Sequence, residues 1–232
     1  MKRITLYTGN YGSGKTELSI HTAIDMARRL RTKEETDYQG ITLVDFDIVN
    51  PYFRSSEQKK LLEEHGVKLL GPSYALNSVD IPSLPPEIAS VFVDRNSRVI
   101  FDVGGDPVGA TALGAYSKRI QDEDYEMLMV VNICRPMTGD AESIVRMAED
   151  IMTNSRLVIS GLVNNANIAR ETTAEQLLQG QEILARVTEK TGIPVRFVSG
   201  MQQVLNAFVK QTGYDGSIVP IELVMRPDWL DM

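Results

Sequence analysis

The chain has 232 residues, of which 43% are hydrophobic and 24% charged, as in an ordinary globular protein. Its formal net charge is −7, so it lacks the basic excess that would neutralise nucleic-acid phosphates, and no nucleic-acid partner is expected. The single cysteine, Cys134, cannot form an internal disulfide. No apolar run approaches the ~20 residues of a membrane span. These features predict a cytoplasmic protein without membrane contact.

Short apolar runs alternate with helical stretches along the chain. In chain order, strands are predicted at residues 4–8, 41–45, 67–70, 99–103, 127–132, 157–163 and 195–198. Helices are predicted at residues 15–30, 57–65, 86–93, 140–152 and 173–191, with another beginning after Gly200. No linker divides the chain. We therefore expect one domain over residues 1–232 with a doubly wound α/β fold, in which a mostly parallel sheet carries helices on both faces.

A glycine-rich loop joins the first predicted strand to the first predicted helix. Its sequence, Gly9-Asn10-Tyr11-Gly12-Ser13-Gly14-Lys15-Thr16, matches the phosphate-loop pattern G-x-x-x-x-G-K-[ST] at every position. Such glycines let backbone N–H groups surround phosphate oxygens at a helix N-terminus. Lys15 is expected to reach the β- and γ-phosphates, and the Thr16 hydroxyl to bind Mg²⁺. All eight residues are therefore candidates for nucleotide binding.

Aspartates follow two other predicted strands. Asp102 ends the strand at residues 99–103 and is expected to hold the magnesium shell. Val103 and two glycines separate Asp102 from Asp106, whose carboxylate could lie near the attacking water. Asp45 and Asp47 alternate at the end of the second strand, so their side chains point the same way, toward the ligand-binding edge. Asp45 or Asp47 is expected to face the metal or the catalytic water.

With these motifs the chain resembles the MinD/ParA and nitrogenase-iron-protein branch of P-loop ATPases, the SIMIBI class. Residues 102–108 are similar to the iron protein's switch II, and Asp47 matches the aspartate that positions water in MinD-like members. The resemblance implies ATP and Mg²⁺ as cofactors. The metal ligands that it implies are Thr16, Asp45 and Asp102. The catalytic residues that it implies are Lys15, Asp47 and Asp106.

The resemblance also implies where the base binds. Residues 161–165 resemble the strand-end G-x-x-x-N of the group, whose asparagine contacts adenine, which assigns Asn165, or Asn164 if the register shifts by one. Ser199, Gly200 and Met201 would then close over the base. Adenine is expected over guanine, because residues 164–167 carry asparagine where guanine-binding proteins have the aspartate of N-K-x-D.

The chain departs from the family in two places. The family's signature lysine is replaced by Asn10, and Tyr11 follows where the family has glycine. In the family, that lysine reaches the nucleotide of a partner subunit. Without it, the sequence does not decide whether the chain forms a homodimer, and slow basal turnover is expected. Arg54, Arg135 or a cation of a client protein could supply the missing charge. A single cysteine excludes the iron protein's iron–sulfur cluster.

Three functions are compatible with these residues. The first is a molecular-switch ATPase that acts on a client protein, for example in metalloenzyme maturation. The second is a small-molecule kinase or synthetase like dethiobiotin synthetase, with a substrate pocket built by residues 72–86. The third is a nucleotide-binding scaffold without hydrolysis. The carboxylates of Asp47 and Asp106 favour hydrolysis, and the Asp-x-Gly-Gly-Asp resemblance favours the switch.

Overall fold

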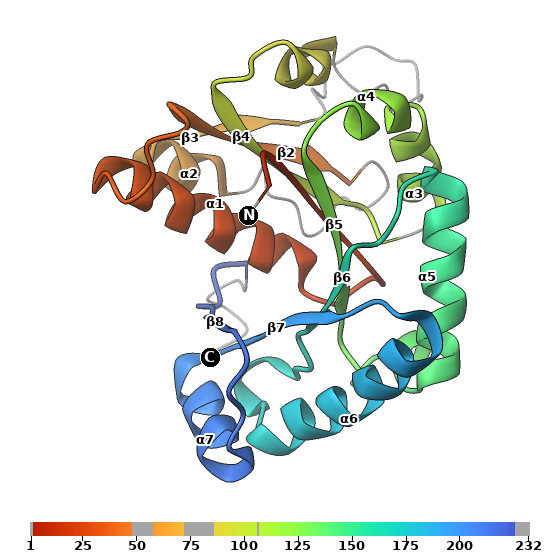
Figure 1. Cartoon of the computed structure of the whole chain (residues 1–232). Helices are drawn as coiled ribbons and strands as arrows, with labels where there is room; N and C mark the ends of the chain where they lie inside the picture. Colours follow the sequence, from red (N-terminus) through yellow and green to blue (C-terminus); the bar gives the residue numbers. More distant parts are fainter. Residues whose placement is uncertain (1, 48–57, 72–85, 106, 226–232) are drawn as a thin grey trace, which may run out of the picture.

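The computed structural model describes residues 2–47, 58–71, 86–105 and 107–225. Within them, eight strands form one sheet in the order β3-β2-β4-β1-β5-β6-β7-β8, and every neighbouring pair is parallel (Figure 1). The strands are β1 (Ile4–Thr8), β2 (Gly40–Phe46), β3 (Val67–Leu70), β4 (Ser97–Val103), β5 (Tyr125–Val131), β6 (Gly161–Asn164), β7 (Val195–Gly200) and β8 (Ile218–Pro220).

Helices cover both faces of this sheet. Figure 1 shows α1 and α2 on one side and α3, α4 and α5 on the other. The α-helices are α1 (Lys15–Arg31), α2 (Lys59–Glu64), α3 (Pro107–Gly114), α4 (Ser117–Gln121), α5 (Ala141–Ser155), α6 (Ala174–Thr191) and α7 (Gln202–Thr212). Short 3₁₀ helices lie at η2 (Pro86–Phe92), η3 (Pro136–Thr138) and η4 (Ala169–Glu171). The predicted doubly wound α/β fold is confirmed.

Each central strand contributes to two separate hydrophobic cores, because successive side chains of a strand point to opposite faces. In β5, Met127 and Met129 pack with the core under α5 and α6, whereas Leu128 and Val130 pack with the core under α1. Strands covered on both faces have continuous apolar sequences. The apolar run of β5 was therefore a sequence signal for a parallel sheet.

The described elements differ from the predicted ones in several respects. For example, the helix predicted at residues 86–93 is the 3₁₀ helix η2, and the strand predicted at residues 127–132 is Tyr125–Val131. The strand predicted at residues 157–163 begins only at Gly161, although Leu157 and Ile159 are buried in the core. Its apolar pattern therefore reports burial rather than strand pairing. The helices α3 and α4 and the strand β8 were not predicted.

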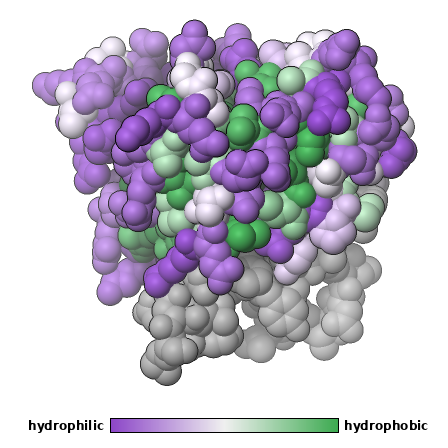
Figure 2. Space-filling view, turned by 90° about the horizontal axis from the view of Figure 1, so that it is seen from below, coloured by the Kyte–Doolittle hydropathy of each residue, from purple (hydrophilic) through white to green (hydrophobic). Residues whose placement is uncertain are grey.

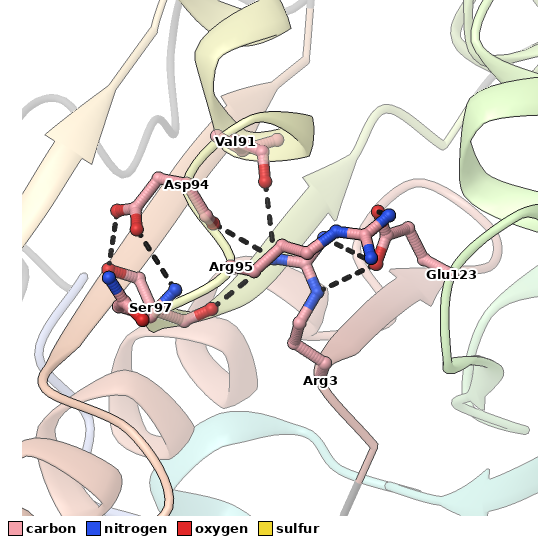
Figure 3. Close-up of polar contacts among 7 residues, drawn as sticks. Arg3, Val91, Asp94, Arg95, Ser97 and Glu123 are labelled. Atoms are coloured by element: carbon pink, nitrogen blue, oxygen red, sulfur yellow. Dashed lines mark hydrogen bonds and ion pairs between the residues drawn. The ribbon is translucent and has the colours of Figure 1, made fainter.

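A buried ion pair fixes the amino end of the sheet, opposite the phosphate loop. The Arg3 guanidinium contacts the Glu123 carboxylate through Nε and Nη2, each at 3.0 Å (Figure 3). Its Nη1 donates to the carbonyls of Val91, Asp94 and Ser97 at 3.2, 3.2 and 3.4 Å. One side chain thus joins the start of β1 to η2, to the turn before β4 and to the loop before β5.

Arg3→Met should lower the free energy of unfolding by about 3–5 kcal/mol, because it leaves a buried carboxylate without its main partner and three carbonyls without their donor. The matched control is Lys2→Met, which removes an exposed ion pair with Asp124 and should lower the free energy of unfolding far less than Arg3→Met does. Urea unfolding measures both. Equal, small losses in the two variants would show that the buried pair does not stabilise the sheet.

Candidate nucleotide-binding site

The sequence segments predicted to form a site meet at one edge of the sheet. β1, β2 and β4 are neighbours, and in their register Asp102 lies opposite both Tyr7 of β1 and Asp45 of β2. The phosphate loop leaves β1 beside these aspartates. Both carboxylates are buried. Such an arrangement at the carboxyl ends of parallel strands is where ligands bind in doubly wound folds.

The phosphate loop closes around the side chain of Lys15. Its Nζ donates to the Asn10 carbonyl at 2.9 Å, and the side chain is buried at the start of α1. Gly9, Gly12 and Gly14 have φ angles of 134°, 71° and 88°, which L side chains rarely adopt. The glycines of the motif are therefore required by the backbone of the loop.

The loop after β4 lies against the phosphate loop. A Cβ atom added to Gly105 would lie 2.7 Å from the Tyr11 nitrogen and 2.8 Å from Lys15 Nζ. One added to Gly104 would lie 3.0 Å from Asp47 Oδ1. The glycine pair of the switch-II-like motif thus permits a close approach to both neighbouring loops. Asp106 itself lies outside the described residues.

The side chains present fit a magnesium ion. Thr16 lines the cavity beside the phosphate loop, and Asp45 and Asp102 are buried and lie in register on β2 and β4. The Asp47 nitrogen donates to Asp45 Oδ1 at 3.2 Å. Mg²⁺ takes oxygen ligands and keeps several waters, with one or two protein carboxylates plus substrate phosphates. Within the described ranges, no three His, Cys, Asp or Glu side chains lie close enough together to hold a metal ion by themselves. A magnesium ion here would therefore depend on phosphate oxygens as well.

A cavity of about 800 Å³ opens beside the phosphate loop. This volume lies within the roughly 300–1,000 Å³ of small-molecule sites. Of the predicted site residues, those that line it are Tyr11, Gly12, Gly14, Lys15, Thr16, Asp47, Asn165, Gly200 and Met201. The cavity therefore extends from the phosphate loop to the ends of β6 and β7.

Asn165 and Asn164 face opposite ways. The Asn165 side chain is buried, its Nδ2 donates to the Ser13 carbonyl at 2.8 Å, and its Oδ1 accepts from the Ser199 hydroxyl at 2.9 Å. Asn164 Nδ2 donates to the Leu177 carbonyl of α6 at 2.8 Å, and Asn164 does not line the cavity. Ser199 lies behind Asn165 and orients its amide, whereas Gly200 and Met201 line the cavity.

Asn132 is a site residue that the sequence did not reveal. It is fully buried, and its Nδ2 donates to the carbonyls of Gly12 at 3.4 Å and Asn167 at 2.9 Å. Its Oδ1 accepts from the nitrogens of Cys134 and Asn167, each at 3.0 Å. It thereby ties the phosphate loop to the loops after β5 and β6. A polar residue that ends the apolar run at residues 127–132 is the signal that could have found it.

The Arg135 side chain lies against the phosphate loop. Its Nε donates to the Gly12 carbonyl at 3.1 Å, and the exposed side chain lines the cavity. The other candidate cation, Arg54, lies outside the described residues. Cys134, next to Arg135, is half-buried, and burial raises the pKa of its thiol above the usual value. The thiol is therefore protonated at neutral pH, as expected of a structural cysteine.

One face of the molecule is only locally apolar. Figure 2 shows this face from below, with green apolar areas set among purple hydrophilic side chains. Five large apolar side chains are exposed in the described part of the chain: Tyr11, Val93, Met137, Val158 and Ile168. Two of them, Tyr11 and Ile168, line the cavity. No described helix has both the length and the apolar character that crossing a bilayer requires.

Comparisons with known proteins identify the fold. No family model matches the chain, and no curated protein matches it either. Among solved structures, FtsY from Mycoplasma mycoides is 19% identical, with a TM-score of 0.53 over 86% of this chain and 60% of that chain. The cell division protein FtsY from Thermotoga maritima is 17% identical, with a TM-score of 0.54 over 84% of this chain and 60% of that chain.

The chain spans about three fifths of the length of these two FtsY structures. At such identities the likeness concerns the fold, and the MinD/ParA branch in particular is not singled out by it. Together with the all-parallel sheet, the comparison shows that the chain has the fold of the SIMIBI class of P-loop NTPases.

Proposed function

We propose that the chain, as one domain, binds ATP with Mg²⁺ and hydrolyses it slowly, as a molecular switch that acts on a client protein. The observation that carries the proposal is that a complete phosphate loop and Asp47 line one cavity, while Asp45 and Asp102 lie buried and in register on the neighbouring strands β2 and β4. An anion-binding loop alone needs no carboxylate nearby, whereas a magnesium-dependent phosphoryl transfer needs an acidic residue for the metal.

Each residue has a distinct role in this proposal. Lys15 holds the β- and γ-phosphates, and Thr16, Asp102 and Asp45 hold the magnesium ion or its waters. The metal would supply positive charge to the phosphate oxygens. Asp47 lines the cavity, where its carboxylate can accept a hydrogen bond from the attacking water and later its proton. Asp106 is proposed to act on the same side.

Arg135 supports slow turnover without the signature lysine. Its guanidinium donates a hydrogen bond to the Gly12 carbonyl of the same chain, so a cation lies at the phosphate loop without a contribution from a partner subunit. Asn10 itself offers no charge to the phosphates. We therefore propose that a homodimer is not needed for nucleotide binding, and that client proteins accelerate turnover.

We expect ATP to bind more tightly than GTP. At the base end of the cavity, Asn167 stands in place of an aspartate, and its Nδ2 already donates to the Asn165 carbonyl at 2.8 Å. Guanine would lose the charge-assisted hydrogen bonds from its N1 and N2 groups. Competitive titration in the presence of Mg²⁺ measures the preference.

The control for this preference is Glu171→Gln, because Glu171 is an acidic side chain that lines the same end of the cavity. The substitution should leave the ratio of the two affinities unchanged. Tighter binding of GTP by the unmodified chain would contradict the adenine assignment. Loss of that GTP preference in the variant would identify Glu171 as the group that reads guanine.

A further inference from the structure

The segment after β8 forms one wall of the cavity. We call residues 221–225 the C-terminal strap. Its first nitrogen, that of Ile221, donates to the Gly200 carbonyl at 2.9 Å, so the strap starts beside the residues that close the base end. Every second residue, Ile221, Leu223 and Met225, lines the cavity. The strap therefore presents an apolar edge to the cavity.

Helix α1 holds the strap in place through two side chains. The Glu17 carboxylate accepts the backbone N–H groups of Val224 and Met225, the latter at 3.2 Å. One helical turn further on, His21 Nε2 lies 2.7 Å from the Glu222 carbonyl oxygen and 2.8 Å from the Glu222 nitrogen. Both contacts go to the backbone of the strap. Its position is thus set by α1 whatever its own side chains are.

The Glu17 carboxylate has an unusual position for an acidic group. Its side chain is buried, with 9% of its surface exposed. No ion pair involves it among the described residues, and its hydrogen bonds come from the two backbone N–H groups of the strap. A buried acid without a cation is costly, so a carboxylate kept here has a specific task.

The apolar wall fits a nucleobase and not a phosphate. Phosphates require N–H donors or cations, and the phosphate loop with Lys15 supplies these at the other end of the cavity. A flat heterocycle instead needs apolar surface on its faces and a few polar groups at its edge. The strap offers the first, and the polar residues Asn165 and Asn167 line the same cavity.

We propose that Glu17 is a positioning residue for the nucleotide base, because it holds Ile221, Leu223 and Met225 as the wall against which the base packs. The inference rests on the proposed function and adds to it a determinant of affinity outside the phosphate loop. Since Glu17 directly follows Thr16, one turn of α1 holds both ends of the nucleotide.

The test compares two ligands, ATP and inorganic tripolyphosphate, each with Mg²⁺. Both can occupy the phosphate loop, but only ATP can reach the strap. Glu17→Ala should weaken ATP binding about tenfold and leave tripolyphosphate binding unchanged, as measured by calorimetry. Leu223→Ala removes part of the wall without touching α1, and should weaken ATP binding about three- to tenfold with the same selectivity. The matched control, Asp25→Ala, removes an exposed acid from the same helix and should change neither affinity.

Equal weakening of both ligands by Glu17→Ala would overturn the proposal, because Glu17 would then act on the phosphate end. Unchanged ATP affinity in Leu223→Ala would overturn it as well, and this variant remains informative if Glu17→Ala does not fold. Failure of the proposed function looks different: the unmodified chain would then bind neither ATP nor tripolyphosphate.

Discussion

Lys15→Ala is expected to abolish the binding of ATP with Mg²⁺, or to weaken it at least tenfold. The Lys15 ammonium is the main side-chain charge that faces the β- and γ-phosphates in a loop of this kind. It is already aimed into the loop, where it donates to the Asn10 carbonyl at 2.9 Å. Isothermal titration calorimetry of the variant gives the dissociation constant directly.

The control for this measurement is Lys190→Ala. Lys190 lies near the end of α6 and pairs with Glu142 at the surface, so its loss removes the same charge away from the cavity. The ATP affinity of Lys190→Ala should equal that of the unmodified chain. Unchanged affinity in Lys15→Ala would refute the assignment of the phosphate loop. Asp102→Asn should weaken only the magnesium-dependent part of binding.

Asp47→Asn is expected to bind ATP with Mg²⁺ normally while it loses most turnover. General-base catalysis by a positioned carboxylate contributes roughly 10²- to 10⁴-fold to a rate, and an amide cannot take the proton. Asp47 lines the cavity next to Gly104, at the point where the loops after β2 and β4 meet. Single-turnover hydrolysis, followed as phosphate release, separates this loss from any change in affinity.

Asp106→Asn should behave like Asp47→Asn, whereas Asp215→Asn, in an exposed position before β8, should keep the full rate. A wild-type rate in both Asp47→Asn and Asp106→Asn would exclude the catalytic roles. In that case a scaffold that binds nucleotide without using these carboxylates becomes the better description of the chain.

Much of the site's framework was predictable because it depends on strand ends. The strands Ile4–Thr8 and Val67–Leu70 have the predicted bounds, and the parallel order of β2, β4 and β1 brings Asp45 and Asp102 together as expected. An apolar run followed by an acidic residue indicates both a buried strand and the carboxyl end of that strand, where ligands bind. This is why motifs far apart in sequence could be assigned to one edge.

The remainder could not be predicted because it depends on contacts between distant segments. The helix α3 (Pro107–Gly114) has no helical spacing of apolar and polar residues, so no periodicity revealed it. The strap is recognisable only from its hydrogen bonds to Glu17, His21 and Gly200, which lie far from it in sequence. The strand-end motif assigned Asn165 and kept Asn164 as the alternative if the register shifts by one. Only the packing of α6 against Asn164 separates them.

The loops around the phosphate loop are tied together by carboxamides. Asn132 bonds to Gly12 and to Asn167, and Asn165 bonds to Ser13, so the backbone of the loop is held from two sides. An amide supplies both a donor and an acceptor without adding charge. A carboxylate at either position would lack the donor and would repel an anionic ligand. Deamidation of Asn132 or Asn165, which turns a carboxamide into a carboxylate, would therefore convert a neutral support of the phosphate loop into a local negative potential.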